Sequence, residues 1–172
     1  MIHIDIDRRT FHFKTPAGTS RGIYTTRQSY FLTIRDDAYP EVKGIGECAP
    51  LPDLSCDAIP EYDNILHQLC KMVENLGKIP YEMLRPYPSI LFGLETAFAQ
   101  LKVQGRTMLF DTPFGRGEEG IRINGLIWMG SFEEMYGRLE EKLKQGFHCV
   151  KLKIGAIDFE KELELIKHIR QS

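Results

Sequence analysis

The stretch Cys149-Val150-Lys151-Leu152-Lys153-Ile154 decides the fold of the second half of this chain. It is short, contains several branched apolar residues and is followed by Gly155, which is typical of a β-strand. A helical pattern precedes it, another follows it, and a further strand is expected over residues 121 to 128. The order strand, helix, strand, helix is typical of a parallel sheet covered by helices. The second half is therefore predicted to consist of two βα units.

The two helices of these units are marked by their ends and by apolar stripes. Ser131 and Glu134 have the spacing of a capping box, and Gly146 stands where the first helix is expected to stop. The second helix is expected to start at Asp158. The residues predicted to face inward are Met135, Leu139 and Leu143 in the first helix and Phe159, Leu163, Ile166 and Ile169 in the second.

The first half of the chain begins with strand patterns. Residues 2 to 6 alternate between isoleucine and polar side chains, and residues 24 to 35 and 41 to 47 are also typical of half-buried antiparallel strands. A meander is the simplest arrangement of the three. Residues 14 to 22, which contain one proline and two glycines, predict a polar loop between the first two strands.

Helical periodicity follows these strands. Apolar residues from Tyr62 to Leu76 fall on one helical face, and Gly77 follows where a helix commonly ends. In a second helix, Ser89 is expected to be the N-cap and Gly105 the stop. The apolar stripe expected for this helix consists of Leu91, Leu94, Phe98 and Leu101.

These patterns predict two domains. Residues 1 to 105 read as an α+β unit, residues 106 to 120 as a linker, and residues 121 to 172 as the start of a second domain. A complete barrel of eight βα units takes about 250 residues, and two units alone leave strand edges unpaired. We therefore expect the front portion of a longer enzyme.

Composition argues against several classes of partner. The 22 basic and 24 acidic residues give a formal net charge of −2, without the positive excess that binds phosphate backbones. No apolar run approaches the roughly 18 residues of a membrane-spanning helix, and the first residues lack the layout of a secretory signal. The four cysteines have no C-x-x-C spacing, so buried free thiols and no metal site are expected. The sequence thus predicts a cytoplasmic protein without nucleic-acid or membrane partners.

Lys151 and Lys153 are the candidate catalytic residues. They stand two apart on a predicted strand, so both side chains project from one face while Val150, Leu152 and Ile154 point to the other. Neighbouring ammonium groups disfavour each other's charge, and one such lysine can abstract a proton. The same spacing is also typical of a solvated strand face or of a charged edge that blocks aggregation.

Four stretches of the chain occur in this order in a known family. They are Lys14-Thr15-Pro16, the run Gly46-Glu47-Cys48-Ala49-Pro50-Leu51-Pro52-Asp53-Leu54-Ser55, the run Pro88-Ser89-Ile90-Leu91-Phe92-Gly93-Leu94-Glu95, and Lys151-Leu152-Lys153. Over nearly its whole length the chain resembles the enolase superfamily, in its muconate-lactonising subgroup, and most closely the o-succinylbenzoate synthases. Dipeptide epimerases and N-acylamino acid racemases share much of this pattern and are the alternatives.

The resemblance implies a fold. Residues 1 to 105 would form an α+β capping domain, an antiparallel sheet plus helices, that closes over the mouth of a TIM-type (β/α) barrel. Residues 121 to 172 would be the first two βα units of that barrel, so the chain would be a truncated enolase-like protein. The resemblance therefore implies the same two domains as the residue patterns.

The resemblance also implies a chemistry. Lys153 would be the acid/base that removes a proton α to a carboxylate, and Lys151 would tune it. Mg²⁺ would stabilise the enediolate, and loss of a hydroxyl would make the enzyme a lyase (dehydratase) of menaquinone biosynthesis. The metal ligands of the family come from later strands, beyond Ser172, so no metal-ligating residue is assigned and this chain alone is expected to be inactive.

The resemblance finally implies substrate contacts in two loops of the cap, residues 15 to 24 and 48 to 55. The expected substrate-binding residues are Thr19, Arg21, Pro50 and Leu51, and the expected partner is a small-molecule carboxylate. A second copy of the chain is a further candidate partner. The alternative from another class is a non-catalytic binding or assembly module that covers its open sheet with a partner.

Overall fold

A computed structural model describes residues 1–19, 21–155 and 157–171 of the chain. The strands are β1 (Ile2–Thr19), β2 (Gly22–Asp36), β3 (Tyr39–Cys48), β4 (Gly125–Ile127) and β5 (Val150–Leu152). The helices are α1 (Tyr62–Leu76), α2 (Tyr81–Leu84), α3 (Pro88–Lys102), α4 (Phe132–Lys144) and α5 (Phe159–Gln171). Two compact units result: the first unit is Met1–Phe13 with Thr26–Glu118, and the second unit is Lys14–Thr25 with Glu119–Ser172. The boundaries predicted at residues 105 and 120 remain predictions.

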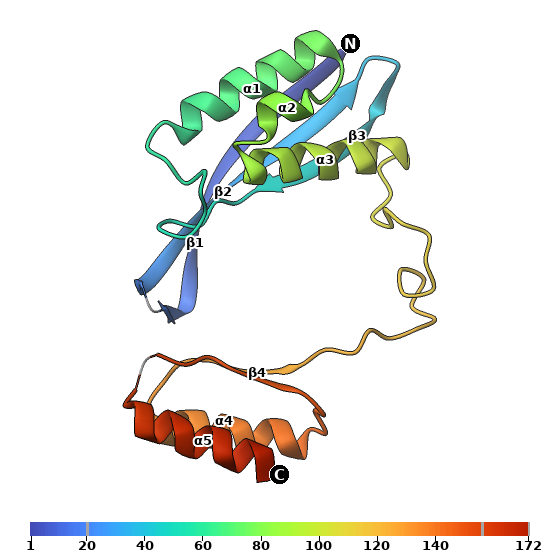
Figure 1. Cartoon of the computed structure of the whole chain (residues 1–172). Coiled ribbons are helices and arrows are strands. Elements are labelled where there is room, and N and C mark those ends of the chain that lie inside the picture. Colours follow the sequence, from blue (N-terminus) through green and yellow to red (C-terminus); the bar gives the residue numbers. More distant parts are fainter. Residues whose placement is uncertain (20, 156, 172) are drawn as a thin grey trace. The chain divides into compact units, whose positions relative to one another are not determined.

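The first three strands form a meander, as the sequence predicts. Their order in the sheet is β1-β2-β3 (Figure 1). Strands β2 and β3 pair antiparallel, with Tyr30 opposite Cys48 and Leu32 opposite Gly46. Within the first unit, α1, α2 and α3 lie over one face of this sheet (Figure 1).

The prediction of a loop over residues 14 to 22 is wrong. Strand β1 continues to Thr19 and β2 begins at Gly22, so the two strands form a long hairpin. Pro16 does not stop β1, because β1 is the edge strand of the sheet and the N–H that proline lacks can face the unpaired side. Ser20, which the prediction included, lies outside the described residues.

Helix α1 is correctly predicted by its apolar periodicity and by its stop signal. Gly77 follows the helix in a left-handed conformation, with φ of 64°, and its N–H donates to Val73 O. Glycine adopts this conformation without steric cost. The fully buried core of the first unit joins the sheet to all three helices through Leu32, Ile34, Leu66, Val73, Leu84, Ile90, Leu94 and Ala97.

Two glycines of β3 allow α3 to lie against the sheet backbone to backbone. A Cβ atom at Gly46 would lie 1.8 Å from the carbonyl oxygen of Gly93, and one at Gly44 would lie 1.9 Å from that of Ala97. Any side chain at these positions would push α3 away. The pair Gly44 and Gly46 therefore fixes the distance between α3 and the strand that leads into the Cys48 to Ser55 loop.

The expected N-cap of α3 is wrong. The helix begins at Pro88 with Tyr87 as its N-cap, two residues earlier than predicted, because proline fits the first helical position, where its missing N–H has no intrahelical partner. Ser89 instead donates its backbone N–H and its hydroxyl to Asp57 Oδ2, at 2.8 and 2.6 Å. Tyr62 OH lies 2.7 Å from Ser89 Oγ and donates to it, since the serine proton is already used. Asp57, which is 1% exposed, thus caps α3 from another segment.

Removing the Asp57 carboxylate is expected to destabilise the first unit. Asp57→Ala would leave two half-buried donors of Ser89 without their acceptor, which costs about 1–3 kcal/mol of unfolding free energy. Asp57→Asn keeps an acceptor oxygen and is expected to cost less. Urea denaturation followed by circular dichroism measures both. Glu61→Ala is the control, because Glu61 precedes α1 without a side-chain cap hydrogen bond. Equal midpoints for all variants would contradict the capping role.

The second unit contains the two predicted βα units. Strands β4 and β5 pair in parallel, and the capping box at the start of α4 is formed, with Ser131 Oγ accepting from Glu134 N–H at 3.2 Å. Met135 and Leu139 are fully buried, as predicted. The stripe predicted for α5 is partly wrong, since Phe159 and Ile166 are exposed while Leu165 is buried. The helix is rotated relative to the predicted stripe because Leu165 fills the space against α4 and the two strands.

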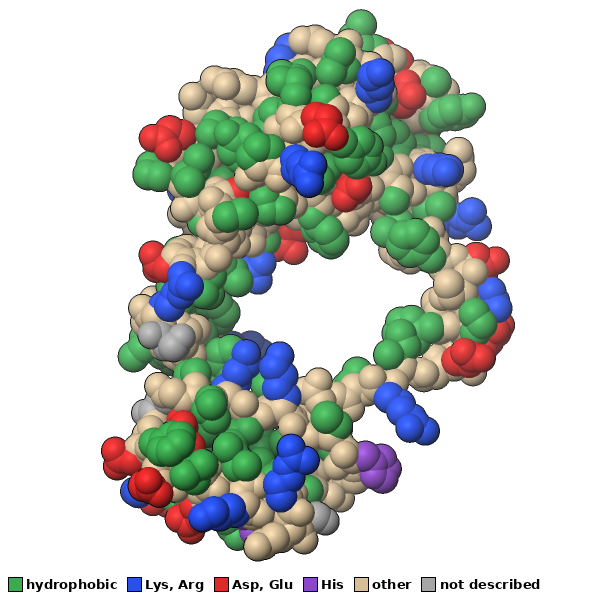
Figure 2. Space-filling view, in the orientation of Figure 1, with side chains coloured by type: hydrophobic (Ala, Val, Ile, Leu, Met, Phe, Trp, Pro, Cys, Tyr) green, Lys and Arg blue, Asp and Glu red, His purple; other side chains and the backbone are tan. Residues whose placement is uncertain are grey.

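Large apolar side chains remain exposed on both units (Figure 2). Phe92 of α3 is 64% exposed, Phe110 is 71% exposed and Phe159 of α5 is 67% exposed. Of the helices in residues 1–19, 21–155 and 157–171, none has the length and apolar composition needed to cross a bilayer.

Candidate active site

The two candidate lysines share one face of the β4-β5 sheet. Val150 and Leu152 of β5 pack against the buried cluster beneath α4 and α5, and neighbouring side chains of a strand point to opposite faces. Lys151 and Lys153 therefore point away from these helices. Lys151 is exposed, and Lys153 is half-buried. The prediction that Ile154 shares the face of Val150 and Leu152 is wrong, because Ile154 follows the strand and is 53% exposed.

Lys153 lies beside the end of β4. Its backbone N–H donates to Ile127 O at 3.1 Å, so the ladder between the strands extends one residue beyond β5. Its Nζ lies 5.8 Å from the ring centroid of Trp128, within the range of a cation–π contact. Arg138 of α4 donates its Nη1 to the carbonyl oxygens of Trp128 and Met129, at 3.0 and 3.2 Å. The turn after β4 is thus fixed by a side chain of α4.

The turn after β5 is fixed by a buried carboxylate. Glu162 of α5 is 5% exposed, and its Oε1 accepts the backbone N–H of Gly155 at 2.5 Å. Gly155 has a φ of 99°, which favours glycine at this position. A carboxylate in the first turn of a helix is also favoured by the helix dipole. Glu162 therefore holds the backbone two residues beyond Lys153.

The candidate loop after β3 is a compact turn. Leu51 N–H donates to Ser55 Oγ at 2.9 Å, and Ser55 N–H donates to Leu51 O at 2.9 Å. The Arg27 guanidinium reaches Ala49 O at 3.4 Å. Leu51 is 37% exposed and stands free of the core. The loop is held by its own hydrogen bonds and by Arg27 of β2, and it leaves Leu51 exposed.

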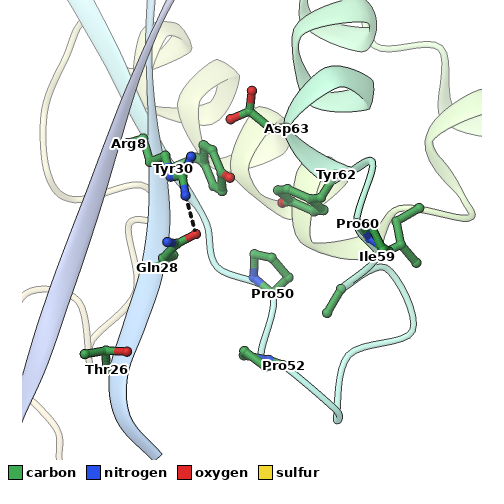
Figure 3. A pocket seen from close by; sticks show the side chains of 11 residues that line it. Arg8, Thr26, Gln28, Tyr30, Pro50, Pro52, Ile59, Pro60, Tyr62 and Asp63 are labelled. Atoms are coloured by element: carbon green, nitrogen blue, oxygen red, sulfur yellow. Dashed lines mark hydrogen bonds between the residues drawn. The ribbon is translucent and has the colours of Figure 1, made fainter.

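Pro50 belongs to the wall of a cavity of about 440 Å³ in the first unit (Figure 3). Arg8 Nη2 donates to Gln28 Oε1 at 3.0 Å on one side of this cavity, and the Arg8 guanidinium lies 5.8 Å from the Tyr30 ring centroid. The rings of Tyr30 and Tyr62 lie 5.3 Å apart. Burial raises the pKa of Tyr62 well above its usual range, so this phenol stays neutral. The wall thus combines aromatic and proline rings with one cation, Arg8, and one carboxylate, Asp63.

Thr19 and Arg21 lie at the end of the long hairpin. Thr19 Oγ1 donates to Gly22 O at 3.1 Å and accepts the Arg21 backbone N–H at 3.1 Å. The Thr19 hydroxyl is therefore engaged in holding the turn. These hydrogen bonds fix the backbone of the turn that carries Thr19 and Arg21. Substrate binding by these two residues stays a prediction.

The six predicted site residues form three local pairs: Lys151 with Lys153, Thr19 with Arg21, and Pro50 with Leu51. Trp128, Arg138 and Glu162 were missed by the sequence reasoning. Trp128 stands at the end of the apolar run that predicted the first strand of the second half. Because functional residues of βα folds lie at strand ends, this position could have marked Trp128 as a candidate. For Glu162 the sequence offered only the weaker indication of an acidic residue in the first turn of a predicted helix. For Arg138 the sequence offered no indication of a role near the lysines.

The described residues do not form a metal site. Across residues 1–19, 21–155 and 157–171, no group of three or more His, Cys, Asp or Glu side chains is arranged to hold a metal ion. Cys48 and Cys70 are buried free thiols, as predicted, and burial raises the pKa of Cys70 to about 12. Cys56 and Cys149 are exposed, so the prediction of burial is wrong for them.

Comparison with known proteins identifies a relative by sequence. No protein-family model matches the chain. The chain is 34% identical over 202 residues to the o-succinylbenzoate synthase of Desulfotalea psychrophila, across 99% of the chain and 54% of that protein. A solved structure of MenC from Desulfotalea psychrophila matches with a TM-score of 0.70 and 27% identity, over 99% of the chain and 53% of that structure. The chain spans about half the length of the curated relative it matches.

Two further solved structures share the fold. The o-succinylbenzoate synthase of Thermosynechococcus elongatus BP-1, with magnesium in its active site, matches with a TM-score of 0.66 and 21% identity over 98% of the chain and 48% of that structure. The L-Ala-D/L-Glu epimerase of Bacillus subtilis, solved with substrate, matches with a TM-score of 0.62 and 22% identity over 98% of the chain and 49% of that structure. The predicted fold class is confirmed.

Proposed function

Because the chain is similar in sequence and fold to about half of an o-succinylbenzoate synthase of the enolase superfamily, we propose that it supplies the acid/base lysines of such a lyase. The observation that carries the proposal is the pair Lys151 and Lys153, which share the sheet face turned away from α4 and α5. Lys153 directly follows β5, at the carboxyl end of a parallel strand. Active sites of (β/α) barrels lie at this end.

The proposed reaction is a dehydration. Lys153 Nζ takes the proton from the carbon next to the substrate carboxylate, and the electron pair of that C–H bond moves into an enediolate. The pair then forms a C=C bond as the C–O bond to the hydroxyl on the neighbouring carbon breaks. The Lys153 ammonium returns its proton to this leaving hydroxyl, which departs as water. Lys151, on the same face, acts on Lys153 through its charge. The product would be o-succinylbenzoate, on the route to menaquinone.

Magnesium belongs to the proposal only for the whole enzyme. The described residues lack a cluster of ligands, whereas the synthase of Thermosynechococcus elongatus carries magnesium in its active site. We assign the ligands to residues outside this chain. The steps given above are those of the two lysines.

The substrate contacts are part of the same proposal. Thr19 and Arg21 of the hairpin, with Pro50 and Leu51 of the loop after β3, would shape the space for a small-molecule carboxylate. Residues 1 to 105 would then act as the cap and residues 121 to 172 as the first barrel units. A cytoplasmic location and the lack of nucleic-acid and membrane partners remain predictions from composition.

The proposal is tested with a hybrid in which this chain replaces the corresponding half of the Desulfotalea psychrophila synthase. The hybrid is expected to form o-succinylbenzoate, followed by its absorbance, in the presence of Mg²⁺. The chain by itself is expected to show no turnover, because no metal-ligand cluster occurs in its described residues. A folded hybrid without activity, or full activity of the chain alone, would contradict the proposal.

A dipeptide epimerase is the second candidate, since the solved Bacillus subtilis epimerase shares the fold. It would use the same proton abstraction without losing a hydroxyl. Incubating the hybrid with L-Ala-L-Glu in deuterated water separates the two, because epimerisation would introduce deuterium at the α-carbon. The synthase proposal expects no exchange in the dipeptide and turnover of the hydroxylated carboxylate.

A further inference from the structure

We propose that Trp128 is a positioning residue for Lys153, whose ammonium group it holds over the face of its indole ring. This role rests on the proposed function, because it matters for catalysis only if Lys153 is the base. The contact itself is a property of the second unit. It can therefore be tested without turnover.

The two side chains meet because of the register of the strands. Leu126 pairs with Lys151 and Ile127 with Leu152, so Trp128 is the next residue in line with Lys153. Both side chains lie on the face away from the helices. The 5.8 Å between Lys153 Nζ and the ring centroid lies within the range in which an aromatic ring attracts a cation.

The position of the indole ring is restricted by hydrogen bonds to the backbone that carries it. Arg138 donates to the carbonyl oxygens of Trp128 and Met129, which ties the residue to α4. Gly130 follows, and a Cβ there would lie 2.7 Å from Glu134 Oε2 and 3.1 Å from Arg138 Nη1. The ends of the Glu134 and Arg138 side chains thus pack directly against the backbone of this turn. Trp128 is 37% exposed, so the ring is anchored at its backbone and open toward solvent.

The consequence concerns the flexible side chain of lysine. A free lysine side chain samples many rotamers, whereas proton abstraction needs the nitrogen at a near-attack distance from one carbon. A ring beside the end of β5 restricts Lys153 Nζ to one side of the strand. Lys151, which is exposed, has no aromatic contact among those found in the described residues. The pair is therefore asymmetric, with Lys153 the positioned member.

The first test uses the single tryptophan of the chain as a reporter. Trp emission of the purified chain is followed from neutral to strongly alkaline pH, where lysine side chains lose their proton. The wild-type emission is expected to change with this ionisation. The change should vanish in Lys153→Met, persist in the matched Lys151→Met variant, and be absent from Lys153→Arg, which stays charged. Tyrosine ionisation contributes equally to all four proteins and is removed by comparison.

The second test measures Lys153 directly. Amine acylation by acetic anhydride at neutral pH is quantified by mass spectrometry, with Lys151 as the internal reference. Trp128→Leu is expected to raise the Lys153 to Lys151 labelling ratio about two- to fivefold, and Trp128→Phe, which keeps an aromatic face, to raise it less. Circular dichroism checks that each variant is folded.

Either of two results would overturn the proposal. One is an emission titration that is the same in wild-type and Lys153→Met chains. The other is a labelling ratio that Trp128→Leu leaves unchanged. An inactive hybrid enzyme would count against the proposed function only, because neither of these measurements involves turnover.

Discussion

A Lys153→Met variant of the hybrid synthase is expected to lose about 10²- to 10⁴-fold in kcat, the usual contribution of a general base. Methionine has a similar length and an apolar stem, so it can occupy the same half-buried position at the end of β5, but it cannot accept a proton. The lost interaction exists only in the transition state. We therefore expect kcat and kcat/KM to fall by similar factors while KM changes little.

The neighbouring lysine separates this role from a general effect of charge. Lys151→Met removes one positive charge from the same sheet face and is expected to lower kcat less and to move the pH profile of kcat, since charge on Lys151 acts on Lys153. Lys167→Met is the control, because Lys167 is exposed on α5. Steady-state rates of o-succinylbenzoate formation measure all three. Turnover of Lys153→Met close to that of Lys167→Met would exclude Lys153 as the base.

The parts of the fold that sequence predicts well are those fixed by local chemistry. Ser131 and Glu134 satisfy each other's backbone donors within one helical turn, so the capping box was legible without tertiary information. Gly77 ends α1 because its own conformation is left-handed. Alternation of side chains predicted that Lys151 and Lys153 share a face, because this follows from strand geometry alone.

The wrong predictions concern positions whose structure is determined by contacts with other segments of the chain. Residues 14 to 22, which contain Pro16 and Gly18, were predicted to form a loop, but β2 pairs alongside β1 and extends this edge strand. Ser89 has the chemistry of an N-cap, yet Asp57, which lies 32 residues away, accepts its two hydrogen bonds. Phe159 was placed inward by periodicity, although Leu165 takes the buried position.

The candidate site shows the same division. The two lysines could be predicted as a pair, because their relation lies within one strand. The contact with Trp128 depends on which strand pairs with β5 and in which register. The hydrogen bonds from Arg138 depend on how α4 packs against β4. This packing cannot be predicted from the residues next to Arg138 in the sequence. Sequence therefore indicates the proposed reacting groups, whereas tertiary packing supplies the residues that we propose position them.

A Gly46→Ala substitution is expected to destabilise the first unit by about 3 kcal/mol or more, at the upper end of overpacking effects. The added methyl group would lie 1.8 Å from the carbonyl oxygen of Gly93, which is backbone and cannot rotate away. Helix α3 must therefore move off β3 and lose buried contact along its length. For a domain of this size such a loss lowers Tm by roughly 10–20 °C, which thermal unfolding by circular dichroism measures.

The matched control is Gly18→Ala, also in a strand, where no atom lies within 4 Å of the added Cβ, and which is expected to leave Tm nearly unchanged. A local probe is Cys48, which follows two residues after Gly46. Burial raises the pKa of the Cys48 thiol far above its usual range, so alkylation is expected to be slow in the native protein. If α3 moves away, this thiol gains solvent and reacts faster in Gly46→Ala. Equal Tm and equal Cys48 reactivity in the two variants would show that α3 does not rest on the glycine backbone.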